Sequence, residues 1–455
     1  MSLTYDQLLE ENALLKAMIK KLEEKISHLE AQINKNSKNS SKSPSSDKKP
    51  NLPLSQKKEY RPYHPGASRQ LLPESEVTSR DVRKVAYCPR CRSVMQATEE
   101  VLKWQQIELP PIKPLVHQIE LVTCLCPRCH LKISPELTEG EQFLLGPRLE
   151  GFINLLMGQY RQGHRPIREI IAMILPGLTL SQGLISKIKA RAAIALSIPY
   201  EELLTTIVSS NNPLHADATG WRHCGQNEYA IVLRVGNLIA YALTPRQNSA
   251  TLRTLLGRCI QRLVTDRGLA CGQIEVATHQ YCIAHLIRNI LGQVEDSGIT
   301  CSDTERLGEL YDTLQELFID KHRAQRGEIS ALTWRHYGYR KWRQIQEMVE
   351  ELTIVGSTKK LRRFCKRLLR ELHYFRAYLK DPSLPMTNNA AEEALRNLVI
   401  ARKLCFGSRS IYGKRWREAL QSCIETLRRN GKSILDFLAE AIYAARTGQQ
   451  SPSVL

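Results

Sequence analysis

Three short segments between residues 214 and 402 decide how this sequence folds: LHADATG (214–220), LVTDRG (263–268) and TNNAAEE (387–393). The first two are strand-like and carry Asp217 and Asp266 at strand ends, whereas the third opens a helix that carries Glu392. Divalent cations prefer hard oxygen ligands, and one carboxylate can bridge two cations. Two strand-end aspartates and a helical glutamate therefore predict a site for two divalent cations.

The residues between the two aspartates predict the rest of a sheet. Tyr229–Leu233 and Leu238–Leu243 are strand-like, and they flank Gly236-Asn237, a pair that suits a tight hairpin turn. A helix is expected after Ser249, before the strand that ends at Asp266. The predicted order is strand, hairpin, helix, strand and then helices, which is typical of a ribonuclease-H-like α/β core.

Five motifs carry a resemblance to a known family: HADAT (215–219), TDRG (265–268), CIAHLIR (282–288), NNAAEEALR (388–396) and VIARK (399–403). Together they resemble the Asp-Asp-Glu transposases, and specifically the insertion sequence 66 family. The resemblance spans nearly the whole chain. It implies that Asp217, Asp266 and Glu392 are the catalytic residues and the ligands of Mg²⁺ or Mn²⁺. Glu393 is the rival of Glu392, but it points about 100° away on a helix, so only one of the two can face the aspartates.

The resemblance implies a prokaryotic, nucleoid-associated enzyme that cuts the ends of an insertion sequence and joins them to target DNA. Its partners would be the terminal repeats, the target DNA and accessory transposition proteins. In the expected reaction, two cations roughly 3.5–4 Å apart activate a water that attacks the phosphodiester, and the freed 3′-hydroxyl then attacks the target. Supporting roles are expected for His285, Asn389 and Arg396.

Two residues depart from the usual family pattern. Ala218 stands where Glu is usual, and Arg267 stands where Gly is usual. They motivate an alternative hypothesis, a transposase-derived DNA-binding protein without catalytic activity. A ribonuclease-H-fold nuclease that cuts without joining is a third possibility.

The charge of the chain indicates a polyanionic partner. Its 455 residues carry a formal net charge of +19, and lysine and arginine bind nucleic acid by neutralising phosphates; a solvated basic surface is the alternative. The residues expected to contact DNA are Arg402, Lys403, Lys414 and Arg415, with Phe406, Tyr412 and Trp416 interleaved as stacking candidates. The sequence has no apolar run near the ~20 residues that span a bilayer, so a soluble cytoplasmic protein is expected.

Residues 1–34 predict a coiled-coil zipper. Leucines recur at one heptad position (Leu8, Leu15, Leu22, Leu29), and Asn12, Ile19, Ile26 and Ile33 occupy the other. Isoleucine at a, leucine at d and one asparagine at a favour a parallel dimer, so we expect a homodimer through residues 8–33. A helix packed on its own chain is the alternative. Residues 35–82, rich in Ser, Lys, Asn and Pro, predict a flexible basic linker.

Four cysteines predict a zinc ribbon over residues 83–135. Cys88 and Cys91 form one Cys-Pro-Arg-Cys motif, and Cys126 and Cys129 form another. Two such pairs supply the four ligands of a structural Zn²⁺, and residues 106–109 and 116–122 between them are strand-like. With 13 cysteines in the chain, reduced thiols and metal fit better than a disulfide framework.

The remaining residues complete a multidomain chain. Residues 140–205 are helical by periodicity, with a break at Pro176-Gly177 and a second helix starting near Ser181. Lys187, Lys189 and Arg191 on that second helix permit a helix-turn-helix interpretation, although many helical hairpins that do not touch DNA have the same pattern. The catalytic core is expected over 210–410, with a helical insertion at about 300–382, and a basic, helical segment over 411–455.

Overall fold

The computed structural model describes residues 15, 16, 18–20, 22, 70–257, 259–269, 274–296 and 298–455. The chain divides into two compact units, Met1–Lys48 with Ile119–Leu455 and, separately, Lys49–Gln118. Of the predicted zipper, only residues 15, 16, 18–20 and 22 are described, and they are helical and exposed. The rest of the zipper, and residues 35–69 of the predicted linker, lie outside the described residues.

None of the helices in the described part of the chain combines the length and the apolar character that a membrane span requires.

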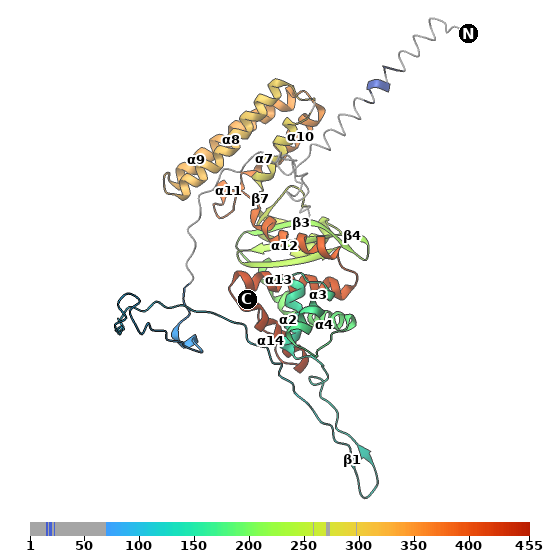
Figure 1. Ribbon diagram of the computed structural model, residues 1–455. Helices are drawn as coiled ribbons and strands as arrows, with labels where there is room; N and C mark the ends of the chain where they lie inside the picture. The colour runs from blue at the N-terminus through green and yellow to red at the C-terminus, as the bar shows by residue number, and fades with distance from the viewer. Residues whose placement is uncertain are drawn as a thin grey trace, which may run out of the picture. The chain divides into compact units, whose positions relative to one another are not determined.

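The larger unit is built on a five-stranded mixed sheet with the order β5-β4-β3-β6-β7 (Figure 1). The strands are β3 (Leu214–His223), β4 (Gln226–Val235), β5 (Leu238–Thr244), β6 (Cys259–Thr265) and β7 (Glu275–Tyr281). Strands β3, β4 and β5 pair antiparallel, whereas β6 pairs parallel to both β3 and β7. The predicted hairpin turn is confirmed, since Gly236 has a positive φ of 57° between β4 and β5.

Alternating side chains give the sheet two apolar faces. Helix α12 (Asn389–Cys405) covers one of them, where it packs against β3, β4 and β5. The buried side chains of that face are Trp221, Ala230, Val232, Ile239, Tyr241 and Leu243. The opposite face, which includes Ala216 and Leu233, packs into the core formed with the helices that precede β3. Because side chains alternate along a strand, Asp217 shares its face of β3 with Trp221 and therefore with α12.

Helix α13 (Ile411–Arg429) protects the edge of the sheet at β5. Three side chains on successive turns of the helix accept hydrogen bonds from alternate β5 backbone N–H groups. Leu243 donates to Glu418 at 2.6 Å, Tyr241 to Ser422 at 2.9 Å and Ile239 to Thr426 at 3.0 Å. An open edge strand is a template for unwanted pairing. Here the α13 side chains accept the hydrogen bonds of β5 N–H groups that a further strand would otherwise accept.

The helices before β3 form a layer with α13 and the last helix, α14. They are α2 (Pro147–Gly158), α3 (His164–Ile174), α4 (Gln182–Ala195) and α5 (Ser197–Val208), and α14 spans Ile434–Thr447. The predicted N-cap is confirmed, because the Ser181 side chain accepts a hydrogen bond from Leu184 N at 3.1 Å. Of the three cations on α4, only Lys187 is exposed; Lys189 is half-buried and Arg191 pairs with the fully buried Glu150. This helix therefore does not present the row of basic side chains that a recognition helix would.

Between β7 and α12 the chain forms five helices. They are α7 (Ile283–Val294), α8 (Cys301–Gln325), α9 (Ala331–Val355), α10 (Lys359–Phe375) and α11 (Ala377–Lys380). Figure 1 shows the long helices α8 and α9 side by side, and they share one apolar cluster with α7 and α10. Gln280 of β7 attaches this region to the sheet: its amide donates to Phe375 O at 2.9 Å and accepts from Tyr378 N at 2.9 Å.

Candidate active site

Asp217 and Asp266 lie on neighbouring parallel strands. Leu214 pairs with Leu263 and His215 with Val264, and continuing this register by two residues brings Asp217 level with Asp266. If this register continued past the end of β6 at Thr265, the two carboxylates would lie on the same face of the sheet, because residues at level positions of adjacent strands point to the same side. One detail differs from the sequence prediction. Asp217 is not at a strand end, since β3 continues to His223 against β4 after its parallel pairing with β6 has ended.

The surroundings of Asp217 disfavour the charged form of its carboxyl group. Burial, followed by the negative charge of Asp266, raises its pKa from 3.8 to about 7, and Glu392 adds to the increase. A hydrogen bond from Ala218 N at 2.8 Å partly opposes this. Three carboxylates that repel one another without a bound cation are the expected electrostatics of a metal site, because like charges in a shared site disfavour ionisation. Asp217 therefore lies within the electrostatic influence of both other predicted carboxylates.

Asn388 fixes the start of the helix that carries Glu392. Its side-chain amide donates to Ala216 O on β3 at 2.9 Å, and its Oδ1 lies 3.0 Å from His215 Nδ1. Its backbone N lies 3.2 Å from the sulfur of Cys282, the residue before α7. Because Asn388 is fully buried and joined to β3 and α7, it determines where α12 begins relative to both aspartates. Sequence reasoning singled out Asn389, which is exposed, and missed Asn388, although the Asn-Asn pair was visible.

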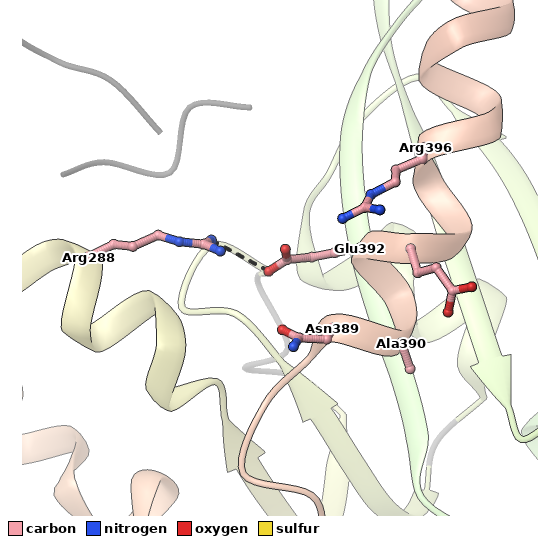
Figure 2. A pocket seen from close by; sticks show the side chains of 6 residues that line it. Arg288, Asn389, Ala390, Glu392 and Arg396 are labelled. Carbon is pink, nitrogen blue, oxygen red and sulfur yellow. Dashed lines mark ion pairs between the residues drawn. The ribbon is translucent and has the colours of Figure 1, made fainter. Parts of the chain in front are cut away.

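The Glu392 carboxylate faces α7. Its Oε1 lies 3.5 Å from His285 Nδ1 and 3.6 Å from Arg288 Nη1, and Figure 2 shows the approach of Arg288. Both distances exceed those of a good hydrogen bond. Oε1 and the His285 Nδ1 are accordingly buried without a hydrogen-bond partner in the described residues. Burial lowers the pKa of His285, more than Glu392 and Asp266 raise it, so the imidazole is neutral near pH 7.

A cleft of about 530 Å³ opens beside Glu392. It is lined by Arg288, Asn389, Ala390, Glu392, Glu393 and Arg396. In Figure 2, Arg396 lies one turn beyond Glu392, and Arg288 approaches from the opposite wall. The structure thus brings the predicted supporting residues His285, Asn389 and Arg396 to the Glu392 end of the site. Arg288 ends the CIAHLIR motif (282–288), but its position beside Glu392 was not predicted, because that position depends on how α7 packs.

Glu393 points away from the aspartates. It pairs with Arg234 of β4 and Arg429 of α13, each at 2.9 Å. Hydrogen bonds from these two arginines lower its pKa to about 2. Its two ion pairs hold α12 to the sheet and to α13, so the choice of Glu392 over Glu393 agrees with the geometry.

Arg267, the unusual neighbour of Asp266, has a structural partner. Its guanidinium lies 2.7 Å from Glu371 of α10 and is nearly buried. It also lies over the rings of Phe364 and Phe375. The arginine therefore links the end of β6 to the helical region and does not displace the Asp266 carboxylate.

The four predicted DNA-contacting residues divide into two pairs. Lys403 and Arg415 are exposed. Arg402 instead donates to Gly220 O and Thr219 Oγ1 on β3, and Lys414 pairs with Glu228 at 2.7 Å. Among the aromatic candidates, Trp416 is buried and donates to Asn154 Oδ1 at 2.8 Å, so it cannot stack on a base. Phe406 and Tyr412 are exposed.

The two Cys-Pro-Arg-Cys motifs adopt the same turn. Cys88 N donates to Ser93 O at 2.8 Å and Arg92 N to Cys88 O at 2.9 Å; Cys126 N donates to Leu131 O and His130 N to Cys126 O, both at 2.9 Å. Arg92 and His130 occupy equivalent left-handed positions, with φ of 62° and 56°. The second turn connects β1 (Cys124–Leu125) to β2 (Lys132–Ile133), which pair antiparallel.

The strands predicted between these motifs are not formed. Residues 106–109 and 116–122 have no strand pairing in the structure. Their apolar side chains are exposed, including Leu109 at 77% and Val116 at 84%, so no buried face stabilises a ladder there. The first motif belongs to the smaller unit and the second to the larger one.

The comparisons with known proteins agree with this geometry. The family model described as "Transposase IS66 family" matches residues 154–415. The chain belongs to this family. Its function is therefore related to DNA transposition, and DNA is its partner. A second model, described as a family of unknown function (DUF6444), matches residues 2–70. No curated protein matches the chain.

Proposed function

We propose that this IS66-family chain is an active transposase that cleaves the ends of its element and transfers the strands to target DNA. Asp217, Asp266 and Glu392 would be its catalytic residues. The observation that carries the proposal is the level register of the two aspartates on β3 and β6, combined with the electrostatic coupling of Asp217 to Asp266 and Glu392. A central strand pairing antiparallel on one side and parallel on the other also supports a ribonuclease-H-like core.

The donor set fits divalent cations such as Mg²⁺ or Mn²⁺. Three carboxylates supply hard oxygen ligands, and Glu392 Oε1 is buried without a hydrogen-bond partner in the described residues. Such cations, when bound, lower the pKa of water and stabilise negative charge on a leaving oxygen. Among the described residues, the group whose ligand atoms all lie within 4.8 Å of one another is instead Cys282, His285 and Glu392. We favour the all-carboxylate site because the Cys282 thiol is held neutral, its pKa being raised by burial.

The protein groups around the triad have separate tasks. Neutral His285 lies against Glu392, and it would help to fix the direction of that carboxylate. Arg288 and Arg396 line the cleft on either side of Glu392 and can bind the phosphates next to the scissile one. Arg guanidinium groups suit this task because they donate to phosphate oxygens in a fixed geometry.

The experiment uses the purified full chain, Mg²⁺ and labelled DNA carrying the element ends. We expect strand cleavage and joining by the wild type, loss of both in Asp217→Asn, Asp266→Asn and Glu392→Gln, and retained DNA binding in all three. Glu393→Gln is the matched control, which should retain catalysis. Chelation of the metal should stop the reaction, and Mn²⁺ should restore it.

The same experiment distinguishes the transposase from the two alternative functions. DNA binding without cleavage by the wild type would favour the inactive DNA-binding protein. Cleavage without joining would instead identify a nuclease.

The same proposal includes one structural zinc per chain, bound by Cys88, Cys91, Cys126 and Cys129. Its support is the same turn at both motifs. Each such turn can present the sulfurs of two cysteines that are separated by two residues. Elemental analysis of the purified chain should give one zinc, which Cys126→Ser should lose. Cys124→Ser is the control; equal zinc loss in both variants would contradict this ligand set.

Pairing through residues 8–33 would join two copies of the chain. The described zipper residues Leu15, Ile19 and Leu22 are helical and 51–58% exposed, so their apolar side chains are accessible to a partner helix. Sedimentation of the full chain should show a dimer, and Leu15→Glu with Leu22→Glu should give a monomer. A monomeric wild type at micromolar concentration would refute the zipper.

A further inference from the structure

A second cavity, of about 360 Å³, lies between α12, α13, α4 and the loop that joins α2 to α3. Three cations line it: Arg161 from the loop, Lys189 from α4 and Arg417 from α13. Its volume falls at the lower end of the ~300–1,000 Å³ of ligand sites. The polar lining is completed by Gln162, His164 and Cys405, and no carboxylate is among the lining residues.

The cations of this cavity are deeply placed. Arg417 is 8% exposed, and its guanidinium lies 4.7 Å from the centroid of the Trp416 ring. The Lys189 Nζ lies 4.4 Å from the same ring. The ring itself is fixed by its hydrogen bond to Asn154, so both cations are held against a rigid wall. Arg161, in a left-handed conformation with φ of 58°, is held by a 2.7 Å hydrogen bond to Asn397.

None of these three cations has a carboxylate ion-pair partner among the described residues. Other buried cations of the chain, such as Lys341 and Lys414, have one. Burying a charge without a partner is unfavourable, and the cations also repel one another: burial and Arg417 lower the pKa of Lys189 to about 8. An arrangement of this kind is stabilised when an anion binds.

One helix N-terminus adds to the positive potential. Helix α3 begins at His164, which lines the cavity, and its N-cap Gly163 supplies no side-chain cap. Unpaired N–H groups at a helix start attract phosphate.

We propose that this cavity binds a phosphate monoester. The group carries a charge of about −1.5 to −2 near pH 7, which matches a cavity with three cations and no acid. A monoester is favoured over an internal DNA diester because Arg417 is buried, out of reach of a duplex backbone, whereas a terminal phosphate protrudes. Its source is either a DNA 5′ end or a free phosphate compound.

The cavity is separate from the Asp-Asp-Glu site. Ala401, Leu404 and Cys405 of α12 line it, and they lie roughly 120–220° around the helix from Glu392. The inference therefore does not depend on the catalytic proposal. All its assays can be run in a chelator, where failure of catalysis has no effect on the result.

Cys405 provides a reporter for the test. Its sulfur is exposed and within hydrogen-bonding reach of Arg417. The full chain is treated with iodoacetamide, and alkylation of each cysteine is followed by peptide mass spectrometry. Inorganic phosphate, compared with chloride at equal ionic strength, should slow alkylation of Cys405 at least fivefold and leave the exposed Cys301 of α8 unchanged. No protection of wild-type Cys405 would overturn the proposal, whatever the variants do.

Variants then assign the cations and the source. Lys189→Met and Arg417→Met should each raise at least tenfold the phosphate concentration that half-protects Cys405, whereas Lys187→Met, at an exposed position on the same helix, should not change it. If a 5′-phosphorylated oligonucleotide half-protects Cys405 at a concentration at least tenfold lower than its 5′-hydroxyl form, the source is a DNA end. Protection by inorganic phosphate but by neither oligonucleotide identifies a free phosphate compound. Equal protection by both oligonucleotides, or by wild type and Lys189→Met, would refute the monoester site.

Discussion

Replacing Asp217 by asparagine should stabilise the metal-free protein at pH 8. The substitution keeps the shape of the side chain and the acceptor for Ala218 N, but it removes a carboxylate that is disfavoured first by burial and then by the charges of Asp266 and Glu392. The rise in the Asp217 pKa from 3.8 to about 7 corresponds to roughly 4 kcal/mol, at about 1.4 kcal/mol per pKa unit. Solvent reaches this half-buried group and screens it, so we expect about 2 kcal/mol, or a rise of about 2 °C in melting temperature for a chain of 455 residues.

The pH dependence follows from the direction of this shift. Because the folded-state pKa is raised, the folded protein holds the Asp217 proton more tightly than the unfolded chain does. Its stabilising effect is complete below pH 4 and is lost as the pH rises through about 7. The asparagine of the variant does not titrate, so the two proteins should be equally stable near pH 4 and differ fully above pH 7.

Thermal unfolding between pH 4 and 8, in a chelator and then with Mg²⁺, measures this. Mg²⁺ should stabilise the wild type at pH 8 and have a smaller effect on Asp217→Asn. Asp312→Asn, at an exposed position on α8, is the control and should show neither effect. An Asp217→Asn protein that is no more stable than wild type at pH 8 would refute the crowding of the three carboxylates.

Three further substitutions test contacts that position the site. Glu393→Gln should retain cleavage but lose about 1 kcal/mol of stability; since the folded-state pKa is lowered to about 2, this loss should be present above pH 4.5 and vanish as the pH falls through 2. Arg267→Ala, which leaves Glu371 paired only with the more exposed Arg367, should cost about 1–3 kcal/mol in thermal unfolding, and unchanged stability would contradict a linking role. Ser422→Ala should cost about 1–3 kcal/mol because the buried Tyr241 N–H loses its acceptor; Ser186→Ala, exposed on α4, is the comparison.

Local patterns predicted much of the catalytic sheet. The apolar runs around Gly236-Asn237 predicted a hairpin, and the structure has it, because turn type depends on two adjacent residues. Whether a given lysine or arginine is exposed or bound to another residue could not be predicted in this way. Arg402 and Lys414 were expected on DNA, but their partners Gly220 and Glu228 are distant in sequence. The phosphate cavity was missed for the same reason, since its cations come from three separate segments.

The position of Glu392 depends on contacts made at both ends of a long insertion. At one end, Gln280 and Arg267 fasten the helical region to β7 and β6. At the other end, Asn388 fastens α12 to β3 and to the start of α7. Closing a long loop costs only about 0.6 kcal/mol for each doubling of its length, so a few buried hydrogen bonds and one ion pair can offset the insertion. The helices between Asp266 and Glu392 therefore need not disturb the triad, provided that these attachments persist.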